Sequence, residues 1–93
     1  MTASYRERIE EYCKAHGIQI PVGFYRHAGD RYAAVDMDAT PPKLVARRWF
    51  SQEDVLYYLK HLPAGKQIRI LDFKDRIELR YEGSSRLKRG GAF

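Results

Sequence analysis

Two pairs of side chains have the types and spacing that catalysis or metal binding would need. The first pair is Cys13 and His16, which are three residues apart in a segment with helical periodicity. A thiol and an imidazole at this spacing could face each other as nucleophile and base, or supply half of a zinc site. Cys13 also belongs to the apolar stripe of the same segment, where cysteine behaves as a small hydrophobic residue. A structural role is therefore the preferred interpretation of both residues.

The second pair is Asp36 and Asp38, in the sequence "DMD". Carboxylates at positions i and i+2 lie on one side of a strand and could hold a divalent cation. Two ligands before the sequence "TPP" are a weak metal signal, and solvation beside a turn explains them better. The sequence contains no glycine-rich phosphate loop, nucleophile elbow or His-Glu-x-x-His motif. We therefore expect no catalysis, no cofactor, no bound metal and no small-molecule substrate.

Length and composition indicate one small globular domain. The chain has 93 residues, of which 44% are hydrophobic and 31% are charged, and a second domain would leave each half too small for its own core. Its one cysteine cannot form an internal disulfide. The charged N-terminal sequence does not resemble a secretory signal, and no apolar run approaches the roughly 20 residues that span a bilayer. These features predict a cytoplasmic protein without a membrane partner.

The positive charge of the chain is concentrated in two short segments. The formal net charge is +5, and residues 43–93 contain twelve Lys or Arg but only six Asp or Glu. The segment "KLVARR" (43–48) and the last ten residues account for this excess. Basic residues near aromatic residues favour nucleic-acid backbone as a partner. The side chains predicted to contact nucleic acid are Lys43, Arg47, Arg48, Arg86, Lys88 and Arg89, with Tyr25 and Tyr32 as a stacking patch beside His27.

Capping signals mark the beginning of two helices. "SYRE" is a capping box that begins a helix at Ser4, and Gly17 lies where a left-handed residue would end it. Within "RRWFSQED", Ser51 is the N-cap of a second helix that ends before "LPAG". Phe50 and Val55 flank this cap as the two halves of a hydrophobic staple. Most of "RRWFSQED" is therefore a signal for the start of a helix, and only its arginines remain candidates for binding.

The remaining periodic segments predict strands. Residues 23–37 alternate as a hairpin around a Gly29-Asp30 turn, and residues 43–50 form a third strand. Residues 66–83 form a second hairpin around Lys74-Asp75, with one buried face and one wet face. The order α-β-β-β-α-β-β predicts an α+β fold in which two helices pack on one face of an antiparallel sheet of about five strands. Residues 1–83 form this domain, and residues 84–93 form a flexible basic tail.

The order helix, three strands, helix over roughly residues 4–62 is similar to that of double-stranded-RNA-binding domains. In that family, lysines at the start of the last helix grip phosphates together with the positive helix end. The corresponding positions here are Gln52, Glu53 and Asp54, which would repel phosphate. Two further strands also follow the second helix. The sequence therefore departs from the family pattern, and membership is not predicted.

A protein partner is the alternative to nucleic acid. Leu71 and Phe73 fall on the outer face of the second hairpin if its strand is regular, and an exposed apolar patch there would mark an interface. A bulge would instead return both side chains to the core, and the sequence does not decide between these two arrangements. We therefore expect a small non-catalytic binding or accessory domain that contacts nucleic-acid backbone. The alternative is a protein-interaction module or a homodimer that uses a sheet face or edge.

Overall fold

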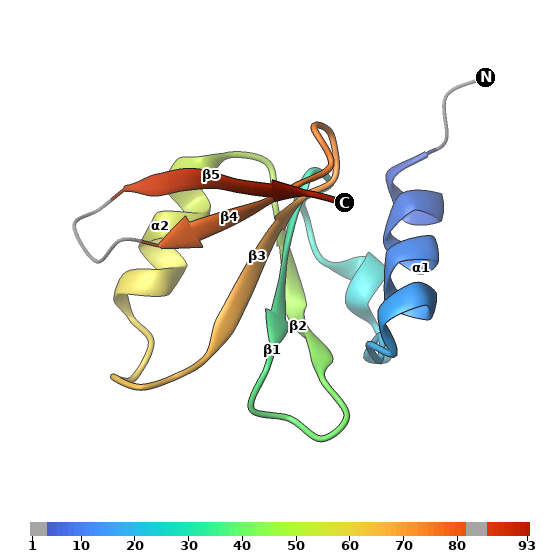
Figure 1. Ribbon diagram of the computed structural model, residues 1–93, viewed down its shortest axis with the longest axis horizontal. Helices are drawn as coiled ribbons and strands as arrows, with labels where there is room; N and C mark the ends of the chain where they lie inside the picture. The colour runs from blue at the N-terminus through green and yellow to red at the C-terminus, as the bar shows by residue number, and fades with distance from the viewer. Residues whose placement is uncertain (1–3, 82–85) are drawn as a thin grey trace.

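The computed structural model describes residues 4–81 and 86–93 and confirms an α+β fold with a five-stranded antiparallel sheet (Figure 1). The strand order is β2-β1-β3-β4-β5, so that β2 and β5 are the two edges. The elements, in chain order, are α1 (Tyr5–His16), the short 3-10 helix η1 (Phe24–Arg26), β1 (Tyr32–Asp36), β2 (Lys43–Trp49), α2 (Gln52–Lys60), β3 (Ile68–Asp72), β4 (Ile77–Tyr81) and β5 (Leu87–Ala92).

Both helices begin at the predicted N-caps. The Ser4 hydroxyl oxygen accepts a hydrogen bond from the Glu7 amide at 3.2 Å, and Ser51 accepts one from the Asp54 amide at 3.3 Å. These side chains satisfy amide groups that have no partner in the first turn of a helix. Gly17 ends α1 with a φ of 64°, as the C-terminal signal predicts.

The prediction that both helices cover one face of the sheet is wrong. Ala33 and Val35 of β1 pack with α1, whereas the alternating residues Tyr32 and Ala34 pack with α2. Because successive side chains of a strand point to opposite faces, the helices cover opposite faces. Figure 1 shows the sheet between α1 and α2. The sheet therefore has two buried faces, each with its own hydrophobic cluster.

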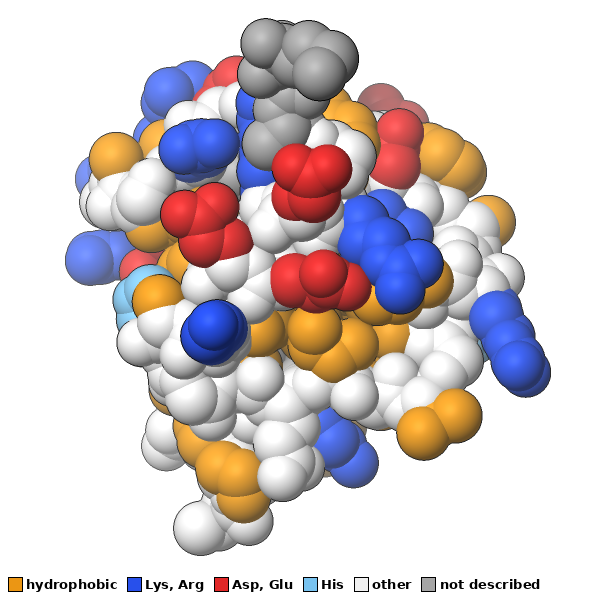
Figure 2. Space-filling view, turned by 90° about the vertical axis from the view of Figure 1, so that its right-hand side faces the viewer, with side chains coloured by type: hydrophobic (Ala, Val, Ile, Leu, Met, Phe, Trp, Pro, Cys, Tyr) orange, Lys and Arg blue, Asp and Glu red, His pale blue; other side chains and the backbone are white. Residues whose placement is uncertain are grey.

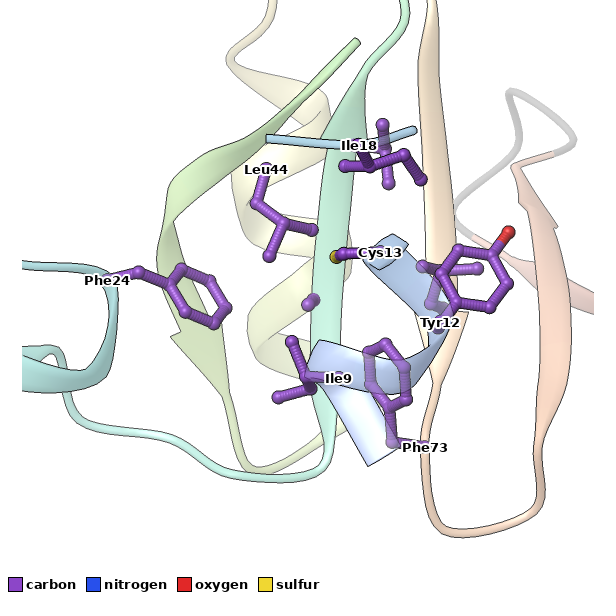
Figure 3. Close-up of a cluster of buried hydrophobic side chains, with 10 residues drawn as sticks. Ile9, Tyr12, Cys13, Ile18, Phe24, Leu44 and Phe73 are labelled. Carbon is purple, nitrogen blue, oxygen red and sulfur yellow. The ribbon is translucent and has the colours of Figure 1, made fainter. Parts of the chain in front are cut away.

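This second buried face also decides the question that the sequence left open for Leu71 and Phe73. Both side chains are 0% exposed and belong to the cluster under α1, as Figure 3 shows for Phe73 beside Ile9 and Tyr12. Leu71 and the neighbouring Ile70 are buried on opposite faces of β3. Leu71 and Phe73 therefore do not form the exposed apolar interface that was one of the two alternatives.

The first predicted hairpin is also wrong, because residues 23–31 do not form a strand. Gly23 has a φ of 82°, and the Arg26 amide donates to its carbonyl at 2.9 Å, which closes the turn of η1. Phe24 is then buried in the α1 cluster from this short helix. Two strands, rather than three, lie between the helices, and the order is α-β-β-α-β-β-β. The element order that was similar to double-stranded-RNA-binding domains is therefore not present.

The predicted flexible tail is instead an ordered edge strand. Ser84 and Ser85 lie outside the described residues, but β5 pairs with β4 from Leu87 to Ala92. The Phe93 ring then packs 4.5 Å from the Tyr12 ring and 5.5 Å from the Phe73 ring, measured between centroids. The chain after the last glycines is thus held by the ladder to β4 and by an aromatic contact with α1.

Candidate binding surfaces

The two basic segments lie at opposite edges of the sheet. Lys43, Arg47 and Arg48 belong to β2, whereas Arg86 precedes β5, which contains Lys88 and Arg89. Three strands separate β2 from β5, so four strand spacings give a distance of about 19 Å between the edges. The structure therefore does not bring the six predicted cations together in one patch.

At the β2 edge, the two arginines point to different faces. Arg47 shares the α2 face with Trp49, and its guanidinium carbon lies 5.5 Å from the centroid of the Tyr58 ring. Arg48 lies on the other face, 5.5 Å from the centroid of the Phe24 ring, and donates to the Asp30 carbonyl at 3.2 Å. Burial lowers the pKa of Arg48. Arg48 therefore serves mainly in packing, whereas Arg47 and Lys43 are exposed cations of this edge.

The predicted tyrosine stacking patch is not formed. Tyr32 is buried in the α2 cluster, whereas Tyr25 packs against the α1 cluster. Arg6 lies 4.4 Å above the Tyr25 ring, and the Tyr25 hydroxyl donates to Glu10 at 3.4 Å. Burial, together with the charge of Glu10, raises the pKa of Tyr25 to about 12. The two rings are thus on opposite sides of the sheet, and neither is free for base stacking.

The α1 side of the molecule carries mixed charge, because α1 contains three Glu and three Lys or Arg. Glu7, Glu10 and Glu11 are exposed on α1, and Figure 2 shows acidic side chains gathered on this side beside arginine and lysine. Phosphate groups would be repelled by these carboxylates. This side of the molecule is therefore not a concentrated cationic surface.

A shallow aromatic hollow of about 230 Å³ lies between β2 and α2. Phe50 is 60% exposed and Tyr57 is 70% exposed, and both line this hollow together with Arg47, Trp49 and Tyr58. Asp54 also lines it and would oppose a phosphate group. The hollow adds apolar surface near Arg47 but does not form a cationic groove.

The free edge of β5 is the surface that the sequence did not reveal. Arg80 and Lys88 are directly opposite each other in the β4–β5 ladder, and Leu79 is opposite Arg89. Leu79 is buried in the α2 cluster, so Arg89, its partner in the ladder, lies on the α2 face. Lys88 is the residue before Arg89 and therefore points to the opposite face of the sheet. Arg86, Lys88 and Arg89 are exposed. Each face of this edge therefore presents positive charge.

The candidate catalytic pairs are both engaged in structural contacts. The Cys13 sulfur points into the cluster under α1 (Figure 3), and the His16 ring stacks on Tyr12 at 4.1 Å between centroids. Lys66 lies 3.0 Å from an Asp36 oxygen and 3.6 Å from an Asp38 oxygen, at the place where a cation would be needed. Among residues 4–81 and 86–93, no group of three or more metal-binding side chains is present.

The burial of Cys13 leads to a prediction about its reactivity. Burial raises the pKa of the Cys13 thiol to about 11, so that very little thiolate is present at pH 8. We expect a chromogenic disulfide reagent to modify the native protein at least about 100-fold more slowly than the protein in concentrated urea. Modification of the native thiol at the rate of the unfolded chain would contradict the buried position of Cys13.

Comparison with protein-family models, with curated proteins and with solved structures gave no match. In the part of the chain that the structure describes, neither helix has the length and apolar character needed to cross a bilayer.

Proposed function

We propose that this protein is a non-catalytic protein-interaction module that accepts an extended segment of a partner at the free edge of β5. The observation that supports this proposal is the ordered edge strand itself. β5 ends the sheet, and no further described strand pairs with its outer side (Figure 1). The unpaired amide and carbonyl groups of an edge strand can bind another strand by backbone hydrogen bonds. A cytoplasmic location belongs to the same proposal, since the single thiol suits a reducing compartment.

The opposite edge of the sheet is much less suited to this role. Gln19 forms a parallel bridge beside the start of β2, where its carbonyl accepts the Leu44 amide at 2.9 Å. At the other end of β2, Gly29 lies so close to the backbone of Arg48 that a β-carbon on it would be 2.3 Å from the Arg48 carbonyl carbon. The chain thus covers both ends of β2, whereas it leaves the outer side of β5 uncovered by described elements.

The glycines of β5 provide a matched pair of variants for testing the proposal. A β-carbon at Gly90 would lie 2.8 Å from the Glu78 carbonyl oxygen, whereas a β-carbon at Gly91 would meet no atom within 4 Å. Gly90→Ala should therefore disturb the pairing of β5 with β4, and Gly91→Ala should leave it intact. Far-UV circular dichroism and thermal unfolding would verify that the rest of each variant is folded.

The test uses labelled eight-residue peptides built on alternating Thr and Val, in acidic, neutral and basic versions. Each peptide has a twin in which alternate residues are proline, because proline cannot donate a ladder hydrogen bond. We expect at least one peptide to bind with a dissociation constant below about 1 mM, with no binding of its twin. Gly90→Ala should weaken this binding, and Gly91→Ala should retain it. Failure of all three peptides, or equal binding of the proline twins, would refute strand addition.

Nucleic-acid backbone is the second candidate partner, and the pairing of Arg80 with Lys88 favours it. Like charges directly opposite each other destabilise a sheet, and a phosphate group beside them would offset that cost. Two carboxylates lie near these cations: Asp75, before β4, pairs with Arg89 at 3.6 Å, and Glu78, on β4, pairs with Arg69 at 3.2 Å. Because these carboxylates would repel phosphate, nucleic acid is the second candidate.

A salt titration would test the nucleic-acid candidate directly. Binding of labelled duplex DNA or RNA should weaken steeply between 50 and 200 mM salt, because each phosphate contact releases counterions. Arg80→Gln should then reduce the dependence on salt by about one contact. No binding at micromolar protein in low salt would exclude this candidate.

A further inference from the structure

We infer that the β5 edge selects an acidic extended segment of another protein and disfavours a second copy of this chain. This inference rests on the proposed function, because it names the chemistry of the strand that would be added. It is carried by the arrangement of the cations on the two sides of β5. Their positions determine which residues of an added strand would face a positive charge.

On one side of the sheet, Arg80 and Lys88 form a cross-strand row that ends at the free edge. An added strand would extend this row by one residue, whose nearest neighbour would be Lys88. Lys88 makes a contact of its own within the structure, so the row would attract a partner through its positive sign and not through a free ammonium group. A carboxylate at this position would be attracted to two cations at once.

On the other side of the sheet, Arg89 occupies the corresponding edge position. Arg89 is opposite Leu79 in the ladder, and its guanidinium lies 3.6 Å from an Asp75 carboxylate oxygen while its side chain is 71% exposed. A pair with this exposure is weak and screened by salt. A carboxylate on an added strand could therefore compete for Arg89. Because Lys88 and Arg89 are consecutive, two consecutive acidic residues of the partner would each face a cation.

The same charges oppose self-association through this edge. If two copies paired β5 with β5 in the registers that bring Lys88 and Arg89 of one copy near those of the other, like charges would meet. Like charges across a strand pair are destabilising, and charged side chains on edge strands are a known protection against pairing of identical chains. The charges thus disfavour a second copy and leave the edge open to a segment of opposite sign.

The C-terminal part of β5 adds little side-chain selectivity. Gly91 has open space at the position of its missing β-carbon, and Gly90 has no side chain to contact a partner. Recognition there must come from the backbone ladder alone. Selectivity is therefore concentrated at Lys88 and Arg89, with Arg86 at the start of the edge.

The experiment compares the acidic, neutral and basic peptides on the wild-type protein and on the double variant Lys88→Glu/Arg89→Glu. The acidic peptide, with two consecutive glutamates, should bind the wild type about tenfold more tightly than the neutral peptide, as two favourable cross-strand pairs allow. The double variant should reverse the order and prefer the basic peptide. Thermal unfolding of the double variant verifies its fold, since both side chains are exposed.

Each outcome of this experiment separates the inference from the proposed function. Equal binding of the three peptides would overturn the acidic preference while strand addition remained supported. A preference that the double variant does not reverse would also overturn it, because the charges of Lys88 and Arg89 would not be its source. Binding by none of the peptides, or equal binding of the proline twins, would overturn both proposals. Sedimentation of the wild type as a dimer that Gly90→Ala dissociates would show that a second copy occupies the edge.

Discussion

Replacement of Asp72 by asparagine is expected to lower the free energy of unfolding by about 3 kcal/mol. Asp72 is 1% exposed and accepts two hydrogen bonds from Arg31, from Nε at 2.9 Å and from Nη2 at 2.8 Å. Its carboxylate also accepts the Lys74 amide at 3.0 Å. The asparagine side chain would leave the Arg31 guanidinium with the more exposed Asp75 carboxylate, 3.3 Å away, as its opposite charge. It would also place an NH₂ group against one of the Arg31 donors. Urea unfolding at pH 7 measures the loss.

The matched control for this substitution is Glu78→Gln. Glu78 also forms an ion pair with an arginine, Arg69, at 3.2 Å. In this pair the Arg69 side chain is 35% exposed and the Glu78 side chain is 36% exposed. Such surface pairs contribute about 1 kcal/mol or less. A loss for Asp72→Asn that is no larger than the loss for Glu78→Gln would contradict the structural importance of the Arg31–Asp72 pair.

The same pair should give the protein a distinct sensitivity to acid. Burial alone would raise the pKa of Asp72, but the hydrogen bonds from Arg31 and from the Asp75 and Lys74 amides outweigh it and hold the pKa below its usual value. Since the pKa is lower in the folded state, this stabilisation is complete above the unfolded value of about 3.9 and is lost as the pH falls through the folded value. Wild type should therefore lose more stability between pH 5 and pH 3 than Asp72→Asn. Equal losses of stability in the two proteins would contradict a lowered pKa of Asp72 in the folded state.

Replacement of Gly29 by alanine should cost more than about 3 kcal/mol. Gly29 has a φ of 122°, which residues with a β-carbon rarely adopt, and its missing β-carbon would lie 2.3 Å from the Arg48 carbonyl carbon. Neither the segment before β1 nor the backbone of β2 can move without loss of packing by Phe24. Chemical denaturation would measure this cost.

Gly17→Ala separates the two causes of that cost. Gly17 also has a positive φ, 64°, but its β-carbon would meet no atom within 4 Å. The left-handed conformation alone should cost about 1–2 kcal/mol. If Gly29→Ala costs no more than Gly17→Ala, the close approach of residue 29 to β2 does not exist in solution.

The helices were predictable from sequence because their signals are local. Ser4, Ser51 and Gly17 act on neighbouring backbone groups, and the structure places each of them at the expected helix end. The sequence around Gly29 predicts a hairpin turn. The actual role of Gly29 is a close approach to β2, which is a contact between distant parts of the chain and has no local signal.

The candidate site was less predictable, because it depends on the strand order. The sequence "IRILDF" predicts a strand with one buried face, and a regular strand of that kind would leave Leu71 and Phe73 outside. An unbroken apolar run is also typical of a strand that is covered on both sides, and α1 provides the second cover. The sequence of β5, with two glycines and two cations before them, has little intrinsic preference for a strand. It becomes one because β4 supplies a ladder and Phe93 anchors its end.

The sheet divides the interior into two hydrophobic clusters, one on each face. The two sides of the molecule can therefore lose their packing separately. Substitutions such as Ile9→Val under α1 and Leu79→Val under α2 share no side-chain cluster, so their costs should add. Detachment of α1 would expose one cluster while α2 still covered the other. This arrangement allows a partly unfolded state whose free energy of opening is lower than that of global unfolding. Such a state would also release Phe93 from Tyr12, which lies on α1, while the contact with Phe73 and the hydrogen bond from the Phe93 amide to the Arg76 carbonyl do not involve α1. Opening of the first helix would therefore remove one of the contacts that hold the end of β5.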